Sequence, residues 1–340
     1  MKKNLSKKTK IILAVLLVIV IAALVPVSIT VLIPEWNLHF RRADMTVSAA
    51  ALSQGSDRIH FLNTGHSDAI LLESDGHFAL VDAGEDSDNP RGFDALDLPG
   101  YEDLVVNYLK THAASADGRV HLDFVLGTHS HSDHIGGFDT VIADSDIDVD
   151  CAYLKVYDSQ KIRDKEIIQW DNQEVYDQMV AALTAKNIPI ISEPSTEPFT
   201  LGNFTVTIFN GIDEPTEGKV GENDQSMGVL VEKDGTRVFL AGDIDNKSGD
   251  ESRLAAQIGD VDLLKVGHHA YPLSSSNDWL RTLSPEYCVV TNAKNEKTNP
   301  ILRRIVRLTD STVFLTNAED GVLAEIGSDG NIAFYNSLHS

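Results

Sequence analysis

THSHSDH at residues 128–134 places three imidazoles and one carboxylate within six consecutive positions. Imidazole and carboxylate ligands suit zinc or another borderline divalent cation, and a chain with only two cysteines offers little for a thiolate site. The apolar run at 122–127 is typical of a buried strand, and Gly136-Gly137 should open the following helix. We therefore expect the ligands on a loop at the C-terminal end of a strand.

The spacing within this segment predicts how its side chains divide between two ions. On an extended backbone His129 and His131 point the same way, because side chains alternate with a period of two. Those two should bind one ion, whereas Asp133 and His134, beyond the bend, should reach a second. The alternative is a polar, histidine-rich loop without metal, which so dense a cluster disfavours.

Two later segments complete the candidate site. The apolar run 239–241 ends in Gly242-Asp243, and a carboxylate at such a strand end can bridge two ions through its two oxygens. The alternative for Asp243 is an ordinary turn aspartate. The run 264–266 is followed by paired imidazoles, His268 and His269. Five of the twelve histidines thus fall in two strand-end loops.

The N-terminal region predicts one membrane-spanning helix. Five lysines and no acid precede residue 11, and residues 11–33 form an uncharged run of 23 positions. At about 1.5 Å per residue this run covers about 34 Å, enough for a hydrocarbon core of about 30 Å. A cleaved signal peptide has a shorter apolar region and a small-residue cleavage site, so we favour an uncleaved signal anchor. The lysines should remain cytoplasmic, which places the rest of the chain outside the cell.

These features divide the chain into four parts: a cytoplasmic basic tail at 1–10, a transmembrane signal anchor at 11–33, a linker at 34–56 and a folded extracellular domain at 57–340. All 51 acidic residues follow residue 33, where 23 Lys and Arg leave a formal charge of −28. Such a surface repels polyanions, so nucleic acid is a disfavoured partner, although basic residues around a cleft could reverse the sign locally. Cys151 and Cys288 lie in strand-like runs and should be buried thiols, with a single bridge as the alternative.

The domain has two blocks of strands, each followed by helices, which predicts two sheets sandwiched between helices. We expect helix at 104–113 and one or two helices within 160–186, whose inward positions are Ile167, Ile168, Val175, Met179 and Leu183. Strands are expected at 59–62, 69–72, 77–81, 199–209, 263–266, 288–290 and 312–315, with a hairpin of 227–231 and 237–241 that turns at Asp234-Gly235.

The three metal motifs together resemble the metallo-β-lactamase superfamily, which implies an α/β (α+β) fold, an αββα sandwich with a dinuclear metal site. The segments 61–69, 81–84, 223–226, 240–243 and 264–269 occur in the order seen in the ComEC-like branch. That branch includes the extracellular metallo-hydrolase domain of DNA-uptake proteins, and a bacterial phosphorylcholine esterase is similar to it. The resemblance covers about residues 57–335.

The resemblance also implies roles for individual residues. His129, His131 and Asp243 would hold one ion, and Asp133, His134, Asp243 and one of the pair His268/His269 would hold the other. We favour His269 as that ligand. Asp133, His268 and Tyr271 are the candidate catalytic residues, with His268 or Tyr271 as a proton donor, and Asp82 should orient a ligand imidazole. The cofactors would be two zinc ions, with manganese as the alternative.

Three departures from the branch pattern affect these expectations. No histidine occurs from 135 to 267, where many superfamily members place another ligand. Asn223, Asp224 and Ser226 stand in that stretch, so one ion should be held more weakly. His66 replaces a common glutamine, which makes it an alternative extra ligand. Ala270-Tyr271 replaces the usual Gly-Ser after the paired histidines.

The function predicted from the sequence is a membrane-anchored extracellular metal-dependent hydrolase, most simply a phosphodiesterase acting on a small-molecule or other phosphodiester substrate. With one predicted helix in the membrane, the chain should not form a channel by itself. The first alternative is hydrolysis of another bond, in a lactone, thioester or β-lactam. The second is a non-catalytic metal-binding or assembly module.

Overall fold

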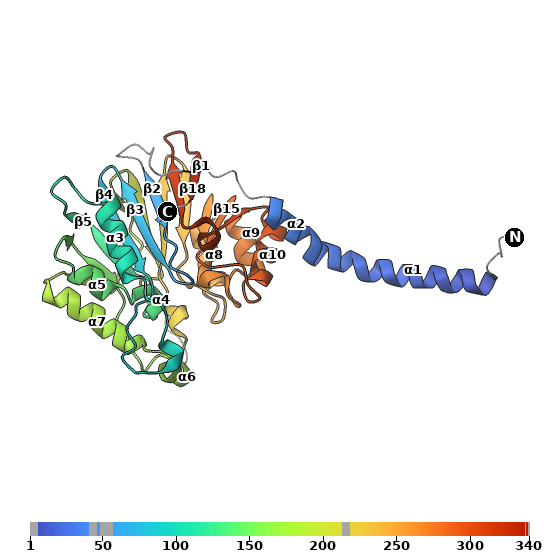
Figure 1. The fold of residues 1–340 in the computed structure, drawn as a ribbon, viewed down its shortest axis with the longest axis horizontal. Coiled ribbons are helices and arrows are strands. Elements are labelled where there is room, and N and C mark those ends of the chain that lie inside the picture. The colour runs from blue at the N-terminus through green and yellow to red at the C-terminus, as the bar shows by residue number, and fades with distance from the viewer. Residues whose placement is uncertain (1–5, 41–45, 48–56, 213–217, 337, 339–340) are drawn as a thin grey trace.

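A computed structural model describes residues 6–40, 46–47, 57–212, 218–336 and 338. Parts of the predicted tail (residues 1–5) and linker (residues 41–45 and 48–56) lie outside the described residues. In the described part, two sheets face each other with helices on their outer sides, and one long helix projects away from this body (Figure 1). The predicted αββα sandwich is therefore confirmed.

The first sheet has nine strands in the order β1-β18-β17-β2-β3-β4-β6-β8-β9. Its central strands β2, β3 and β4, which lie where strands were predicted, form an antiparallel meander, and β4 pairs with β6 in parallel. The strand bounds are β1 Thr46–Val47, β2 Arg58–Phe61, β3 Ala69–Ser74, β4 His77–Ala83, β6 Phe124–Gly127, β8 Ala152–Leu154, β9 Ile190–Ile191, β17 Val322–Ile326 and β18 Ile332–Asn336.

The second sheet has seven strands in sequence order, β10 to β16, and its second half is parallel. The hairpin of β12 and β13 turns at Asp234-Gly235 as predicted. The strand bounds are β10 Phe199–Leu201, β11 Phe204–Phe209, β12 Gly228–Lys233, β13 Thr236–Leu240, β14 Leu263–Lys265, β15 Tyr287–Val290 and β16 Thr312–Leu315. A separate pair, β5 (Val120–Leu122) with β7 (Ile147–Val149), flanks the first sheet.

Three apolar layers hold the sandwich together. Phe61, Phe204 and Phe314 belong to the layer between the two sheets. The outer layers lie beneath α3, α5 and α7 on the first sheet and beneath α8, α9 and α10 on the second. The helix bounds are α3 Glu102–His112, α4 Ser132–Ile135, α5 Phe138–Ala143, α6 Asp164–Gln169, α7 Asn172–Ala185, α8 Asp250–Ile258, α9 Asn277–Leu283, α10 Asn299–Leu308 and α11 Thr316–Glu319, with short 3-10 turns at Asp94–Leu96, Glu222–Gln225 and Gly267–Ala270.

The apolar run at 122–127 is not one strand. Asp123 interrupts it, because the Asp123 carboxylate accepts hydrogen bonds from the Phe78 backbone N–H and the His77 ring at 3.2 and 2.8 Å. β6 therefore starts at Phe124. Two further expectations change in the same region. Asp133 and His134 lie on the short helix α4 and not on a loop. Of the two glycines expected to open the next helix, Gly137 alone is the N-cap of α5.

The predicted helical region at 160–186 forms two helices, α6 and α7. Val175, Met179 and Leu183 of α7 are buried as predicted. The prediction for Ile168 is wrong, since its side chain is 69% exposed. α6 ends before Asp171 and is not continuous with α7, so the inward positions of the two helices do not follow one helical period.

The N-terminal segment is helical from α1 (Lys7–Val27) through a π-helical turn (Ser28–Leu32) into α2 (Ile33–Phe40). Within the described residues, Lys7–Trp36 is the one helix long and apolar enough to cross a membrane. The helix continues through Pro34, so the first residues of the predicted linker are helical. Cys151 and Cys288 are both free thiols, and the alternative of a bridge between them is excluded.

Candidate metal centre

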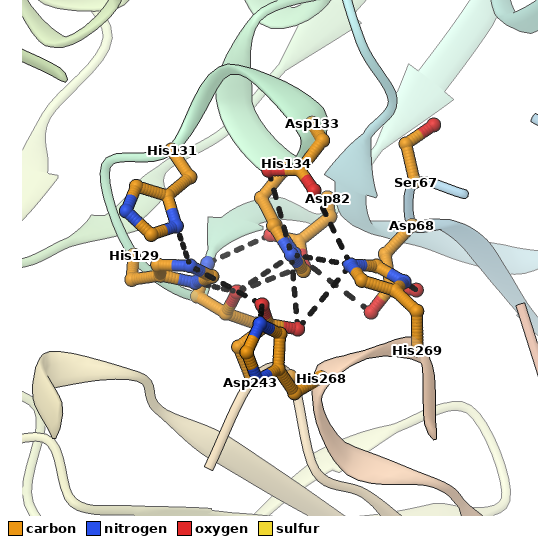
Figure 2. Close-up of polar contacts among 12 residues, drawn as sticks. Ser67, Asp68, Asp82, His129, His131, Asp133, His134, Asp243, His268 and His269 are labelled. Atoms are coloured by element: carbon orange, nitrogen blue, oxygen red, sulfur yellow. Dashed lines mark hydrogen bonds and ion pairs between the residues drawn. The ribbon is translucent and has the colours of Figure 1, made fainter. Parts of the chain in front are cut away.

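The candidate ligands come from both sheets and meet at the ends of their central strands. His129 and His131 follow β6, and α4 carries Asp133 and His134. Asp243 follows β13, and the paired histidines follow β14. Figure 2 shows these side chains converging on one place, with Asp243 opposite the β6–α4 segment. The histidine motif at 129–134 is thus brought together with two motifs that lie more than 100 residues later in the sequence.

The first potential metal-binding group consists of His129, His131 and Asp243, which each offer one ligand atom within 4.8 Å of the others. His129 Nε2 lies 3.0 Å from His131 Nδ1 and 3.9 Å from Asp243 Oδ2. The two imidazoles share one side of the loop, as the alternation of side chains predicts.

The second group consists of Asp133, His134 and His269, whose ligand atoms also lie within 4.8 Å of one another. Asp243 Oδ1 lies 3.1 Å from His134 Nε2 and 3.4 Å from His269 Nε2. The two oxygens of Asp243 therefore face different groups, Oδ2 the first and Oδ1 the second. This is the arrangement that a bridging carboxylate requires.

The hydrogen bonds of the second group fit a cation. His134 Nδ1 lies 2.7 Å from Asp82 Oδ2, and His269 Nδ1 lies 3.0 Å from Thr291 Oγ1, whose hydroxyl donates to Asp68. Both rings form these hydrogen bonds through Nδ1, so their Nε2 atoms, which face each other at 3.1 Å, are the available ligand atoms. A metal ion bound by both Nε2 atoms would take the place of a proton there.

The environment of Asp243 is a second observation that fits a bound metal ion. Its Oδ1 atom is buried and has no hydrogen-bond partner among the described residues. Burial opposes its charge, but the imidazoles of His134, His269 and His268 hold the pKa of Asp243 well below the usual value. An ionised, buried oxygen facing imidazole nitrogens is a suitable ligand for a borderline divalent cation. The residues present therefore fit a metal centre.

Asp82 occupies the orienting position that we predicted. Besides His134 Nδ1 it accepts hydrogen bonds from the Thr128 backbone N–H and hydroxyl, both at 2.8 Å. Burial alone would lower the pKa of His134, but the carboxylates of Asp243, Asp82 and Asp133 outweigh it and raise the value. Asp82 thus fixes the ring orientation and keeps Nε2 directed at the site.

The paired histidines have different environments. His269 is fully buried and belongs to the second group, whereas His268 is one-quarter exposed and lies 3.9 Å from Asp243 through its Nε2. His268, His269 and Ala270 all have positive φ, at 51°, 47° and 60°. This strained backbone turns consecutive side chains to different sides, and Ala270 stands where a glycine would be less strained.

The pocket in front of the ligands is a cavity of about 440 Å³. His131, Asp133, His268 and Tyr271 reach it, so the candidate catalytic residues share one space. His66 also lines it but belongs to none of the potential metal-binding groups, and burial lowers its pKa. The remaining lining includes cations, acids and an apolar wall: Arg163, Lys247, Lys297, Glu85, Glu166, Asn223, Asp224, Asp245, Ala95, Leu98, Trp170 and Leu273.

Asp224, in the stretch without histidine, belongs to none of the potential metal-binding groups among the described residues. Ser226 Oγ accepts a hydrogen bond from the Asp243 backbone N–H at 2.8 Å, and Asp224 pairs with Arg163 at 3.2 Å. Within the described residues the first group thus keeps three protein ligands. The expectation that one ion is held more weakly stays a prediction.

Sequence reasoning missed two carboxylates behind His131. Glu166 Oε1 lies 3.2 Å from His131 Nε2 and accepts the Glu222 backbone N–H at 2.6 Å, while Glu222 accepts the Ser130 N–H at 2.8 Å. Burial raises the pKa of Glu222 to about 7. Nothing in the spacing of these residues pointed to the histidine motif, since α6 and the turn after residue 221 are distant in sequence.

A buried ion pair was missed as well. Lys265 and Asp68 are both almost fully buried and contact each other, and Lys265 Nζ donates to the Gly242 carbonyl at 3.0 Å. Asp68 in turn lies 3.3 Å from His269 Nδ1. The one available signal was a lysine inside the apolar run 263–266. This pair joins the ends of β3, β13 and β14 beneath the ligands.

Two sequence comparisons find similarity to known proteins. A family model described as a beta-lactamase superfamily domain matches residues 77–276, more than half of the chain. A competence protein, ComA from Neisseria gonorrhoeae, is 32% identical over 108 residues, which cover 28% of this chain and 16% of that protein. The matched part thus spans a small fraction of its relative.

Several solved structures are similar at low identity. The diiron beta-hydroxylase CmlA from Streptomyces venezuelae matches with 15% identity and a TM-score of 0.45, covering 77% of this chain and 53% of that one. The metallo-beta-lactamase fold protein YhfI from Bacillus subtilis matches with 14% identity and a TM-score of 0.46, covering 76% and 96%. Zinc-bound PqqB from Methylobacterium extorquens matches with 14% identity and a TM-score of 0.43, covering 75% and 86%.

Proposed function

The chain belongs to the beta-lactamase superfamily, and from this premise we propose that it is a membrane-anchored, extracellular phosphodiesterase with a dinuclear zinc centre. The observation that carries the proposal is the division of the Asp243 carboxylate between two groups of ligands. Manganese is the alternative metal. The ligands would be His129, His131 and Asp243 for one ion and Asp133, His134, Asp243 and His269 for the other.

Two divalent ions held by these residues would supply Lewis acids for the attacking and leaving oxygens of an in-line displacement and for the charge on a phosphoryl group. The chain contributes the rest. Asp82 and Asp68 hold the imidazoles of His134 and His269 in place. His268, whose Nδ1 is buried and has no hydrogen-bond partner among the described residues, lies beside the centre and is the candidate donor to a leaving oxygen, with Tyr271 next to it.

The pocket supports a small or zwitterionic diester as substrate. Arg163, Lys247 and Lys297 line it together with the acids Glu166 and Asp224, so the lining has both signs of charge. A polyanion would meet these acids and the −28 charge of the outer domain. Nucleic acid is therefore the less favoured substrate.

The purified chain, loaded with zinc, should hydrolyse bis(p-nitrophenyl) phosphate or p-nitrophenyl phosphorylcholine, and a chelator should stop the reaction. His131→Ala should abolish the activity, because His131 lies in the first group of ligands. His121→Ala is the matched control, since this exposed histidine pairs with Asp150 away from the centre. Hydrolysis of lactones or β-lactams with no diesterase activity would refute the phosphodiesterase proposal while leaving the metal centre intact.

The anchor proposal concerns α1 and the turn after it. The lysines before residue 11 and the apolar helix Lys7–Trp36 favour an uncleaved anchor with its N-terminus in the cytoplasm. Protease added to intact cells should remove the C-terminal domain and leave an N-terminal tag protected. Digestion of the tag with protection of the domain would mean the opposite orientation.

A further inference from the structure

The N-terminal helix is held against the folded domain by its one acidic residue. Glu35 is the first acid in the chain. Its Oε1 accepts a hydrogen bond from Arg303 Nε at 2.7 Å, and its Oε2 accepts one from Lys294 Nζ at 2.5 Å. α2 and the preceding turn Ser28–Leu32 both contact α10, as the neighbouring ribbons in Figure 1 illustrate.

This contact is more than a single surface ion pair, which would contribute little. The carboxylate is shared between two cations from different segments of the domain, and Pro34 beside it is buried. The π-helical turn packs against α10 in addition. The helix and the domain are therefore joined by packing and by a small charge network.

The contact fixes the depth of α10 relative to a membrane. The 30-residue helix Lys7–Trp36 is about 45 Å long, which matches a bilayer including its headgroup layers. Ser28–Leu32 is the last full turn of the uncharged run 11–33, and α10 contacts it. If that run spans the bilayer, α10 lies at the level of the headgroups.

The charge of this region is opposite to that of the rest of the domain. Residues 294–307 contain one acid and five cations, whereas the residues after 33 together carry −28. The α10 residues that face the core are Ile301, Leu302, Ile305 and Val306. The basic residues lie on the other side of the helix or in the preceding loop: Lys294, Lys297, Arg303, Arg304 and Arg307.

We propose that loop 292–298 and α10 form a membrane-contact surface for anionic phospholipid headgroups, and that Glu35 holds this surface against the bilayer. The inference rests on the proposed insertion of the anchor. Basic segments next to a membrane helix are attracted to anionic lipids over about a Debye length. Lys297 lies 5.5 Å from the ring centre of Tyr271 and both line the pocket, so one edge of the pocket would lie near the lipid surface.

The test uses the full chain in lipid nanodiscs with a single fluorescent label. Cys151→Ser removes the partly exposed thiol, and Cys288 is buried. The label is placed at Glu296→Cys in the proposed surface, or at Glu197→Cys as the control. Glu197 lies next to β10, at the edge of the seven-stranded sheet opposite β16 and α10. The lipids carry a nitroxide quencher on the headgroup.

We expect the label at 296 to be quenched several-fold more than the label at 197. The difference should be larger with phosphatidylglycerol than with phosphatidylcholine and should shrink in high salt. Glu35→Lys, which places a third cation beside Lys294 and Arg303, should reduce quenching at 296, whereas Glu35→Gln should reduce it less.

Equal quenching of both labels in inserted protein would overturn the inference. Quenching of the label at 296 that is the same with phosphatidylglycerol and phosphatidylcholine would overturn the preference for anionic headgroups. Insertion is measured separately, by co-migration of the protein with the nanodisc. Protein that fails to insert would refute the anchor proposal, and this inference with it, independently of any label.

Discussion

Replacing Asp243 by alanine should remove most of both metal ions and lower hydrolysis by more than about 10²-fold, the loss typical when a single preorganised hydrogen-bond donor to the transition state is removed. Asp243 is the one residue whose two oxygens face both ligand groups, His129 on one side and His134 with His269 on the other. Its loss would leave four imidazoles, those of His129, His134, His268 and His269, without their shared anion. Metal content after dialysis, measured by mass spectrometry, checks the expectation directly.

Two controls separate a lost ligand from a damaged fold. Asp243→Asn keeps the shape and one oxygen acceptor, so it should keep more metal than the alanine variant. Asp148→Ala removes an exposed carboxylate that pairs with Arg119 far from the centre, and it should keep both ions. Two bound ions in a well-folded Asp243→Ala protein would contradict the bridging role.

The sequence predicted those parts of the site whose residues lie close together along the chain. Local geometry alone predicts where four of the side chains point, those of His129, His131, Asp133 and His134. The alternation of an extended strand sets the first two, and one helical turn sets the other two. The hairpin at Asp234-Gly235 is equally local. Asp243 and the paired histidines follow β13 and β14, adjacent parallel strands whose ends share one edge of a sheet. The His129 segment follows β6 of the other sheet, and its meeting with them was implied by the resemblance to a sandwich fold.

The parts that sequence missed depend on partners far apart along the chain. Lys265 and Asp68 form a buried pair, but a lysine in an apolar run does not reveal which carboxylate will meet it. Glu166 and Glu222 reach the His131 segment from two further elements. Ile168 was misplaced because the break between α6 and α7 changes the phase of the helix.

The left-handed backbone at His268 and His269 belongs with these missed features and bears on the chemistry. Consecutive residues at positive φ cost free energy and persist only when surrounding contacts impose them. Here the N–H of His268 donates to the Gly242 carbonyl, and the His269 ring is held by Thr291 and Asp68. The turn thereby directs His269 into the second ligand group and leaves His268 at the pocket wall.

The two histidines should therefore respond differently to the same substitution. His269→Ala should lose about one equivalent of metal and nearly all activity, because it removes a fully buried member of the second group. His268→Ala should keep both ions, since His268 belongs to neither of the two groups of ligands. Its turnover should fall by about 10²–10⁴-fold if it acts as a general acid, with a smaller change in KM.

The leaving group distinguishes a proton donor from a residue that only shapes the pocket. With p-nitrophenol, a good leaving group that needs little protonation, His268→Ala should lose less activity than with a diester whose leaving group is an alkoxide. Tyr271→Phe, which keeps the ring beside His268 and removes one hydroxyl, is the matched comparison. Loss of metal from His268→Ala with full retention in His269→Ala would reverse the two roles, because the strained turn would then have to present the exposed imidazole to the ions and the buried one to the substrate.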